Sequence, residues 1–179
     1  MKFLLNPQDR DPEFASLFKS TFTESEGPAE GDLIGELVTA LLADTPKDDI
    51  YTVAAEMDGT LVAACILTRL LVKNDSRCVF LLAPVAVIPE HQGKGIGQQL
   101  ISYGLDVMRK SDVDVVMTYG DPSFYGKVGF EWVAEADAPP PYALQFPQGW
   151  QRVCLSGRPW SSLKGPSTCV GAFSNPALW

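Results

Sequence analysis

At residues 85–100 the chain reads VAVIPEHQGKGIGQQL. An apolar run leads into a turn with three glycines, and the turn leads directly into an amphipathic pattern. Glycine lets the backbone adopt angles that a side chain forbids and lets it approach a bulky group closely. The helix expected after the turn begins with unpaired N–H groups and a partial positive charge, which together attract anions. The stretch therefore predicts a strand, a turn and a helix that hold a phosphate-bearing ligand.

Two familiar phosphate-binding loops do not fit the spacing of this turn. A P-loop requires GxxxxGK followed by Ser or Thr, whereas the lysine of the turn, Lys94, comes before the final glycine. A dinucleotide-binding loop requires GxGxxG, and the sixth residue counted from Gly93 is Gln98. A nucleotide-dependent kinase and a dehydrogenase are therefore disfavoured.

The segment before this stretch predicts two helices and a hairpin. Residues 2–5 form a short edge strand, and helical spacing of apolar residues follows Asp11 and again Asp32. The acidic segment between them, residues 23–31, contains glycine and proline and is expected to be a loop. Two strand-like runs then flank Asp58-Gly59, the strongest hairpin signal in the chain.

The core of the sheet is expected on both sides of the glycine-rich turn. Residues 78–87 are too apolar for an exposed strand, and Pro84 predicts an interruption or a bulge because proline cannot donate a ladder hydrogen bond. A helix at residues 96–110 leads to a second core strand at 113–118, which should run parallel to the first.

The last third of the chain predicts shorter elements. A short helix includes Phe124 and Tyr125, and a tail rich in Gly, Pro and Ser docks through its aromatic residues. Three strands are expected between them, at residues 130–133, 142–146 and 151–155. The domain organisation predicted is one domain over residues 1–150, with the last strand and tail at 151–179 packed on it.

Composition limits the partners. The 179 residues carry a formal net charge of −8, which argues against a nucleic-acid binder. No apolar run approaches the length needed to span a membrane, so no membrane partner is expected. The four cysteines form no CxxC pair and His91 is the one histidine, so no metal site is predicted. We interpret the cysteines as reduced thiols of a cytoplasmic protein, with disulfides as the alternative.

Two motifs carry a resemblance to a known family. The run Gln92-Gly93-Lys94-Gly95-Ile96-Gly97 resembles the pyrophosphate loop of the GNAT acetyltransferase superfamily, (Arg or Gln)-x-x-Gly-x-(Gly or Ala). Downstream, residues 120–130 resemble the family's segment in which a tyrosine of a short helix is followed by Gly-Phe. Together the matches cover about residues 50–135, and the tail resembles the end of a bacterial subgroup of predicted N-acetyltransferases.

The resemblance implies a fold and an activity. The fold would be α+β, the GNAT fold, with a central mixed, mostly antiparallel sheet, a splayed parallel strand pair and flanking helices. A primary amine, most simply that of a small molecule, would attack the thioester of acetyl-CoA directly, without a metal. The alternative is a GNAT-fold acyl-CoA sensor or interaction module that transfers nothing. A monomer or a homodimer would serve either function.

The resemblance also assigns roles to residues. Val87 would direct its backbone N–H at the thioester oxygen, and Tyr125 would be the general acid, because a phenol with a pKa of about 10 is protonated at neutral pH. The alternative for Tyr125 is that its ring only packs. Glu24 or Glu26 is a candidate general base, with Glu56 or a water chain as alternatives. The expected acetyl-CoA-binding residues are Val85, Ala86, Val87, Gln92, Gly93, Lys94, Gly95, Ile96, Gly97 and Gln98.

Overall fold

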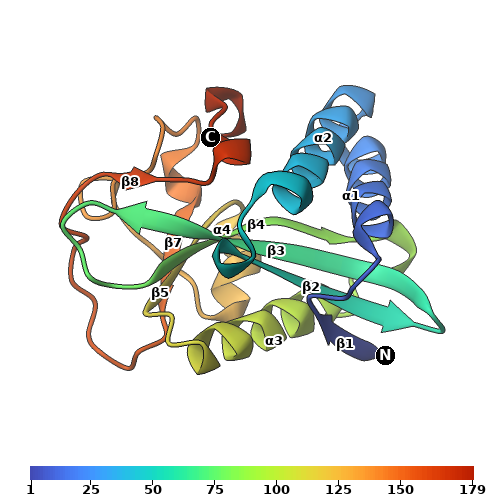
Figure 1. The fold of residues 1–179 in the computed structure, drawn as a ribbon, viewed down its shortest axis with the longest axis horizontal. Coiled ribbons are helices and arrows are strands. Elements are labelled where there is room, and N and C mark those ends of the chain that lie inside the picture. Colours follow the sequence, from blue (N-terminus) through green and yellow to red (C-terminus); the bar gives the residue numbers. More distant parts are fainter. The chain divides into compact units, whose positions relative to one another are not determined.

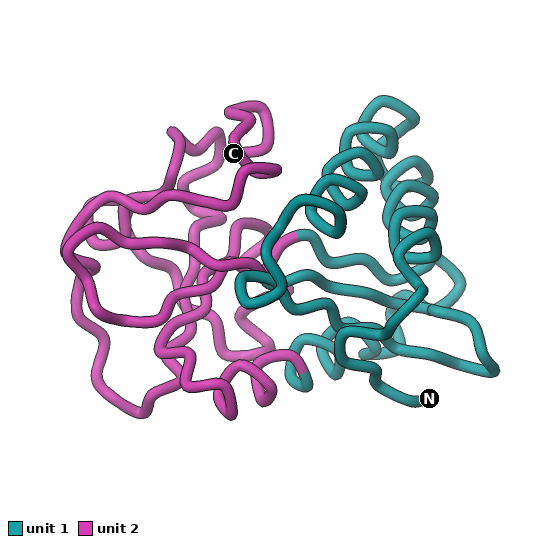
Figure 2. The backbone as a smooth tube through the Cα atoms, in the orientation of Figure 1, with its two compact units in different colours: residues 1–67, 84–103 teal, residues 68–83, 104–179 magenta.

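The computed structural model describes residues 1–179 as two compact units. The first unit comprises Met1–Leu67 and Pro84–Tyr103, and the second comprises Thr68–Ala83 and Gly104–Trp179 (Figure 2). Two strands and one helix contribute residues to both units: β3 (Thr60–Val72), β4 (Val79–Val87) and α3 (Ile96–Lys110).

The first unit contains the predicted edge strand and hairpin. Strand β1 (Lys2–Leu5) pairs antiparallel with β2 (Ile50–Met57), and β2 turns into β3 through Asp58-Gly59. Both turn residues have positive φ, +50° and +83°, as a type I′ hairpin turn requires. Both predictions are therefore confirmed.

Two long helices, α1 (Asp11–Glu26) and α2 (Pro28–Asp44), lie side by side in the same unit (Figure 1). The prediction of an acidic loop at residues 23–31 is wrong, because Gly27 alone separates the helices, with φ +100°. Pro28 can begin the next helix at once, since the first helical residue needs no N–H partner. A Cβ on Gly31 would lie 1.8 Å from Thr23 Oγ1, so this glycine lets the helices approach closely.

The second unit contains the parallel pair. Strand β4 runs parallel to β5 (Val115–Tyr119), β5 pairs antiparallel with β7 (Trp150–Cys154), and β7 pairs antiparallel with β6 (Glu131–Trp132). Strand β8 (Ser167–Thr168) pairs antiparallel with β3. Helix α3 follows β4 and leads to β5, and the short helix α4 (Pro122–Tyr125) follows β5. The mostly antiparallel sheet with one parallel pair and helices confirms the α+β class.

Short 3-10 helices occupy several connections: η1 (Lys47–Asp49), η2 (Pro89–His91), η3 (Gly126–Val128), η4 (Pro147–Gly149), η5 (Gly171–Phe173) and η6 (Pro176–Leu178). None of the helices is both long and apolar enough to cross a membrane.

All four cysteines are free thiols, as expected, and burial raises the pKa of Cys65 to about 12.

The predicted strand at residues 142–146 is wrong, because this segment is irregular. Its backbone donors have other partners: Phe146 N–H donates to the Tyr119 hydroxyl at 2.7 Å, and Gln145 N–H donates to the Trp179 carbonyl at 3.2 Å. Prolines at 139–141 and at 147 bound the segment and cannot donate to a ladder.

The tail docks through aromatic side chains, as expected. The Trp179 ring packs against Trp150, Phe173 and Tyr142 at centroid distances of 6.2, 6.1 and 6.3 Å. Trp150 is fully buried, and its indole N–H donates to the Ala138 carbonyl at 2.7 Å. Trp150 therefore joins the tail to the buried core through both its ring and its indole N–H.

We expect Trp150→Phe to lower the free energy of unfolding by about 2 kcal/mol, because it leaves a cavity and an unpaired buried carbonyl. Trp132→Phe is the matched control: its indole also donates to a carbonyl, that of Pro147, but the side chain is 60% exposed. This control should cost less than about 0.5 kcal/mol. Urea unfolding followed by circular dichroism measures both, and equal losses would contradict the role of Trp150.

Candidate active site

The hydrogen-bond direction of β4 shifts by one residue along the strand. The Leu82 carbonyl accepts from Thr118 Oγ1 of β5 at 2.9 Å, whereas Ile88 N–H donates to the Val62 carbonyl of β3 at 3.0 Å. In a regular strand, residues six apart direct their polar groups to the same edge. Here they face opposite neighbours, so the alternation is broken between them, as at a β-bulge. This supports the bulge predicted at Pro84, although the strand is not interrupted there.

The shift determines where the Val87 backbone points. Its neighbour Ile88 donates to β3, so the N–H of Val87 in extended backbone is directed to the opposite edge of β4. The parallel register with β5 covers Val79–Leu82, and β4 continues to Val87 beyond it. The residues Val85, Ala86 and Val87 all lie in the part of β4 that follows this register.

Side chains brace the turn after β4. Gln92 Nε2 donates to the Val87 carbonyl at 2.9 Å, and Lys94 Nζ donates to the Glu90 carbonyl at 2.8 Å. Both contacts fold the turn back on itself through η2. Gln92 was predicted only as an acetyl-CoA-binding residue. Its side chain also holds the backbone of Val87, whose N–H is predicted to face the thioester oxygen. The sequence held no signal for this contact, which depends on the path of the turn.

The glycines give the turn its shape. Gly93 and Gly95 have φ of +71° and +76°, in the left-handed region that glycine adopts without strain. The first helical bond of α3 runs from Gln99 N–H to the Gly95 carbonyl at 3.1 Å. The N–H groups of Ile96, Gly97 and Gln98 therefore belong to the open first turn of the helix. Together with the helix dipole, they can bind an anion such as a pyrophosphate.

Tyr125 lies in the second unit, at the end of α4. Asp121 caps this helix, with Oδ1 accepting from Ser123 N–H at 2.8 Å. The Ser123 hydroxyl and N–H lower the pKa of this carboxyl. The Tyr125 ring is half-buried and packs edge-on against Phe124 and Phe130.

The candidate bases differ in their surroundings. Glu24 and Glu26 are exposed in the last turn of α1, which contains no basic residue. Glu56 on β2 instead forms an ion pair with Arg10, whose Nη1 lies 2.6 Å from Glu56 Oε2. Arg10 also pairs with Glu13. Glu56 therefore ties β2 to the start of α1, which makes it a structural residue.

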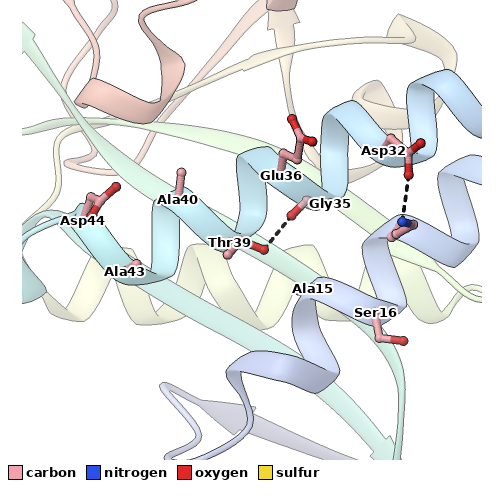
Figure 3. Close-up of a pocket in the computed structure, with 10 residues that line it drawn as sticks. Ala15, Ser16, Asp32, Gly35, Glu36, Thr39, Ala40, Ala43 and Asp44 are labelled. Atoms are coloured by element: carbon pink, nitrogen blue, oxygen red, sulfur yellow. Dashed lines mark hydrogen bonds and ion pairs between the residues drawn. The ribbon is translucent and has the colours of Figure 1, made fainter.

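A groove of about 590 Å³ runs along α1 and α2 in the first unit (Figure 3). An ion pair between Lys19 Nζ and Asp32 Oδ1, 2.7 Å apart, crosses it, and Thr39 donates to the Gly35 carbonyl on one wall. Its lining residues are Ala15, Ser16, Lys19, Asp32, Gly35, Glu36, Thr39, Ala40, Ala43 and Asp44. None of the predicted site residues lines this groove.

Comparison with known proteins gives consistent matches. The family model described as an acetyltransferase (GNAT) domain matches residues 7–133. The uncharacterized N-acetyltransferase YjhQ of Escherichia coli K12 is 32% identical over 148 residues, which cover 80% of this chain and 81% of that protein.

Two solved structures share the fold at lower identity. The CoA complex of the E. coli GNAT N-acetyltransferase YhbS is 22% identical, with a TM-score of 0.77 over 97% of this chain and 92% of that one. A GNAT acetyltransferase from Brucella melitensis, in complex with acetyl-CoA, is 22% identical, with a TM-score of 0.73 over 96% and 98%.

Proposed function

The chain belongs to the GNAT acetyltransferase family, and we propose that it moves the acetyl group of acetyl-CoA to a primary amine of a small molecule. Acetyl transfer from acetyl-CoA is the activity of the family. The amine, the direct attack and the role of each residue are our proposal. The observation that carries it is the Val87 N–H, directed away from β3 and held beside a turn of open N–H groups.

The first unit supplies what the donor requires. The backbone N–H groups from Gly93 to Gln98 would bind the pyrophosphate of acetyl-CoA, since positive φ at Gly93 and Gly95 shapes the turn and the α3 dipole favours negative charge. Val85, Ala86 and Val87 would pair with the pantetheine arm as an added strand does. These groups fit acetyl-CoA because backbone N–H groups can donate hydrogen bonds both to its phosphate oxygens and to the amide carbonyls of its pantetheine arm.

The chemistry is a single displacement. The amine nitrogen attacks the thioester carbon, and the carbonyl oxygen of the thioester becomes negatively charged. The Val87 N–H would stabilise that charge. The carbon–sulfur bond then breaks, and Tyr125 would give its phenolic proton to the CoA thiolate. Holding both reactants in place replaces a bimolecular encounter, which is a large part of the acceleration.

The amine must lose a proton before or during the attack. Glu24 or Glu26 would accept it, directly or through water, because both are exposed carboxylates that are not committed to an ion pair as Glu56 is. The absence of basic residues in the last turn of α1 also favours a cationic amine nearby.

The test is incubation of the protein with acetyl-CoA and a library of primary amines, with CoA release followed by chromatography. Chromatography is preferred to a thiol reagent because the protein has four free cysteines of its own. Amine-dependent release with a matching acetylated product is the expected result. Tight acetyl-CoA binding without turnover on any amine would support the sensor alternative and contradict the proposal.

We expect Gly95→Ala to weaken acetyl-CoA binding by about 10-fold or more, because the pyrophosphate lies against this backbone. Gly59→Ala in the hairpin is the matched control, since its φ of +83° resembles the +76° of Gly95. Both changes should cost about 1–2 kcal/mol of stability from left-handed strain. Calorimetric titration separates them: equal acetyl-CoA affinities would contradict the binding role of the turn.

We expect Tyr125→Phe to lower kcat by about 100-fold, within the usual range for general acid catalysis, and to leave acetyl-CoA affinity nearly unchanged. Tyr103→Phe is the control, because its ring stacks on Phe3 and keeps that contact without the hydroxyl. Steady-state kinetics with the amine found above measures both variants. An unchanged kcat for Tyr125→Phe would show that its ring only packs.

A further inference from the structure

Gly120 follows β5 and lies against the Cε2 edge of the Tyr125 ring. A Cβ on Gly120 would be 2.7 Å from Cε2 of Tyr125 and 3.6 Å from Cζ, the carbon that bears the hydroxyl. The φ of Gly120 is not in the positive region, so its backbone does not require glycine. The ring itself occupies the space of the missing side chain. Glycine at this position is therefore explained by Tyr125.

A second glycine, Gly149, packs its backbone against that of Gly120. Gly120 N–H donates to the Gly149 carbonyl at 3.0 Å, and a Cβ on Gly149 would lie 2.9 Å from the Gly120 oxygen. Two backbones thus touch where side chains would hold them apart. The contact fixes where the Gly120 backbone lies against the edge of the Tyr125 ring.

The buried amide of Gln151 closes this arrangement. Its side chain is 1% exposed, and Nε2 donates to the carbonyls of Gly120 at 3.2 Å and Gly149 at 3.3 Å. One amide nitrogen therefore holds both glycine backbones at once. A buried polar side chain with two such bonds is costly to disturb, since removing it unpairs groups away from water.

Two aromatic rings also pack against Tyr125. Phe130 packs edge-on against Tyr125 at a centroid distance of 5.7 Å, and Phe124 does so at 5.1 Å. The Gly120 backbone at one edge and two packed aromatic rings together restrict how far the Tyr125 ring can move.

We propose that Gly120, Gly149 and Gln151 form a backbone platform that positions the phenol of Tyr125 for proton donation. These are positioning residues, since none of them is assigned a contact with the reacting atoms. The proposal rests on the proposed function, in which Tyr125 is the general acid. It adds that the transfer rate depends on the platform as well as on the hydroxyl.

The test replaces Gly120 by alanine. The added methyl pushes the ring by about 0.7 Å to an ordinary 3.4 Å contact, and a misplacement near 1 Å can cost about 100-fold in rate. We expect kcat to fall about 10- to 100-fold, with the KM for acetyl-CoA within about twofold. Gly126→Ala is the matched control, because it is one residue after Tyr125, helical in φ, and has open space around its Cβ position. It should leave kcat unchanged.

A double variant separates this proposal from the assignment of the acid. Gly120→Ala should add almost nothing on a Tyr125→Phe background, because there is no proton donor left to misplace. A full additional loss in the double variant would overturn the platform. If Tyr125→Phe alone has no effect, the acid assignment fails; if it slows transfer and Gly120→Ala does not, only the platform fails.

A spectroscopic measurement tests the geometry without any acceptor. In protein labelled with 3-fluorotyrosine and saturated with acetyl-CoA, Tyr125→Phe identifies one of five tyrosine signals. Gly120→Ala and Gln151→Met should both shift or broaden that signal, and Gly126→Ala should not. Gln151→Met keeps the length of the side chain and removes its donors, so it probes the platform without inserting bulk. An unmoved Tyr125 signal in both variants would overturn the proposal.

Discussion

The shift in hydrogen-bond direction along β4 is the constraint on which the proposed acetyl-CoA site depends. Up to Leu82 the strand bonds to β5, and at Ile88 it bonds to β3 with the opposite alternation. Without the shift, the N–H of Val87 would point into the β3 ladder and be used there. With it, the N–H of Val87 is directed away from β3, as the proposed pairing with an extended ligand requires.

The break in β4 and the glycine-rich turn before α3 could be predicted from local sequence. A proline inside an apolar strand predicts a break in the ladder, and three glycines before an amphipathic pattern predict a turn with a helix behind it. These inferences succeed because each depends on residues within about one turn or one strand. The hairpin at Asp58-Gly59 was predictable for the same reason.

The errors arose where distant parts of the chain decide the structure. The acidic segment looked like a loop, yet Gly31 lets α2 pack against Thr23 of α1, so both helices continue through it. Residues 142–146 have strand-like composition, but Tyr119 and Trp179 provide their hydrogen-bond partners. The contact of Gln151 with two glycine backbones joins segments about 30 residues apart, and no local pattern reveals it.

The glycines show why residue type alone does not reveal a role. Gly93 and Gly95 have left-handed backbone angles, and the space around their missing Cβ atoms contains no atom closer than 3.8 Å. Gly120 and Gly149 have ordinary angles, but their neighbours fill the Cβ positions. Gly93 and Gly95 adopt a backbone conformation that shapes the turn, and they leave space where a ligand could lie. Gly120 and Gly149 instead leave space that other atoms of the protein fill. A sequence motif detects the first kind, because the turn is local. The second kind emerges only when the fold brings Tyr125, β5 and β7 together, so no local pattern predicts how the Tyr125 ring is packed, whereas the shape of the glycine-rich turn could be predicted.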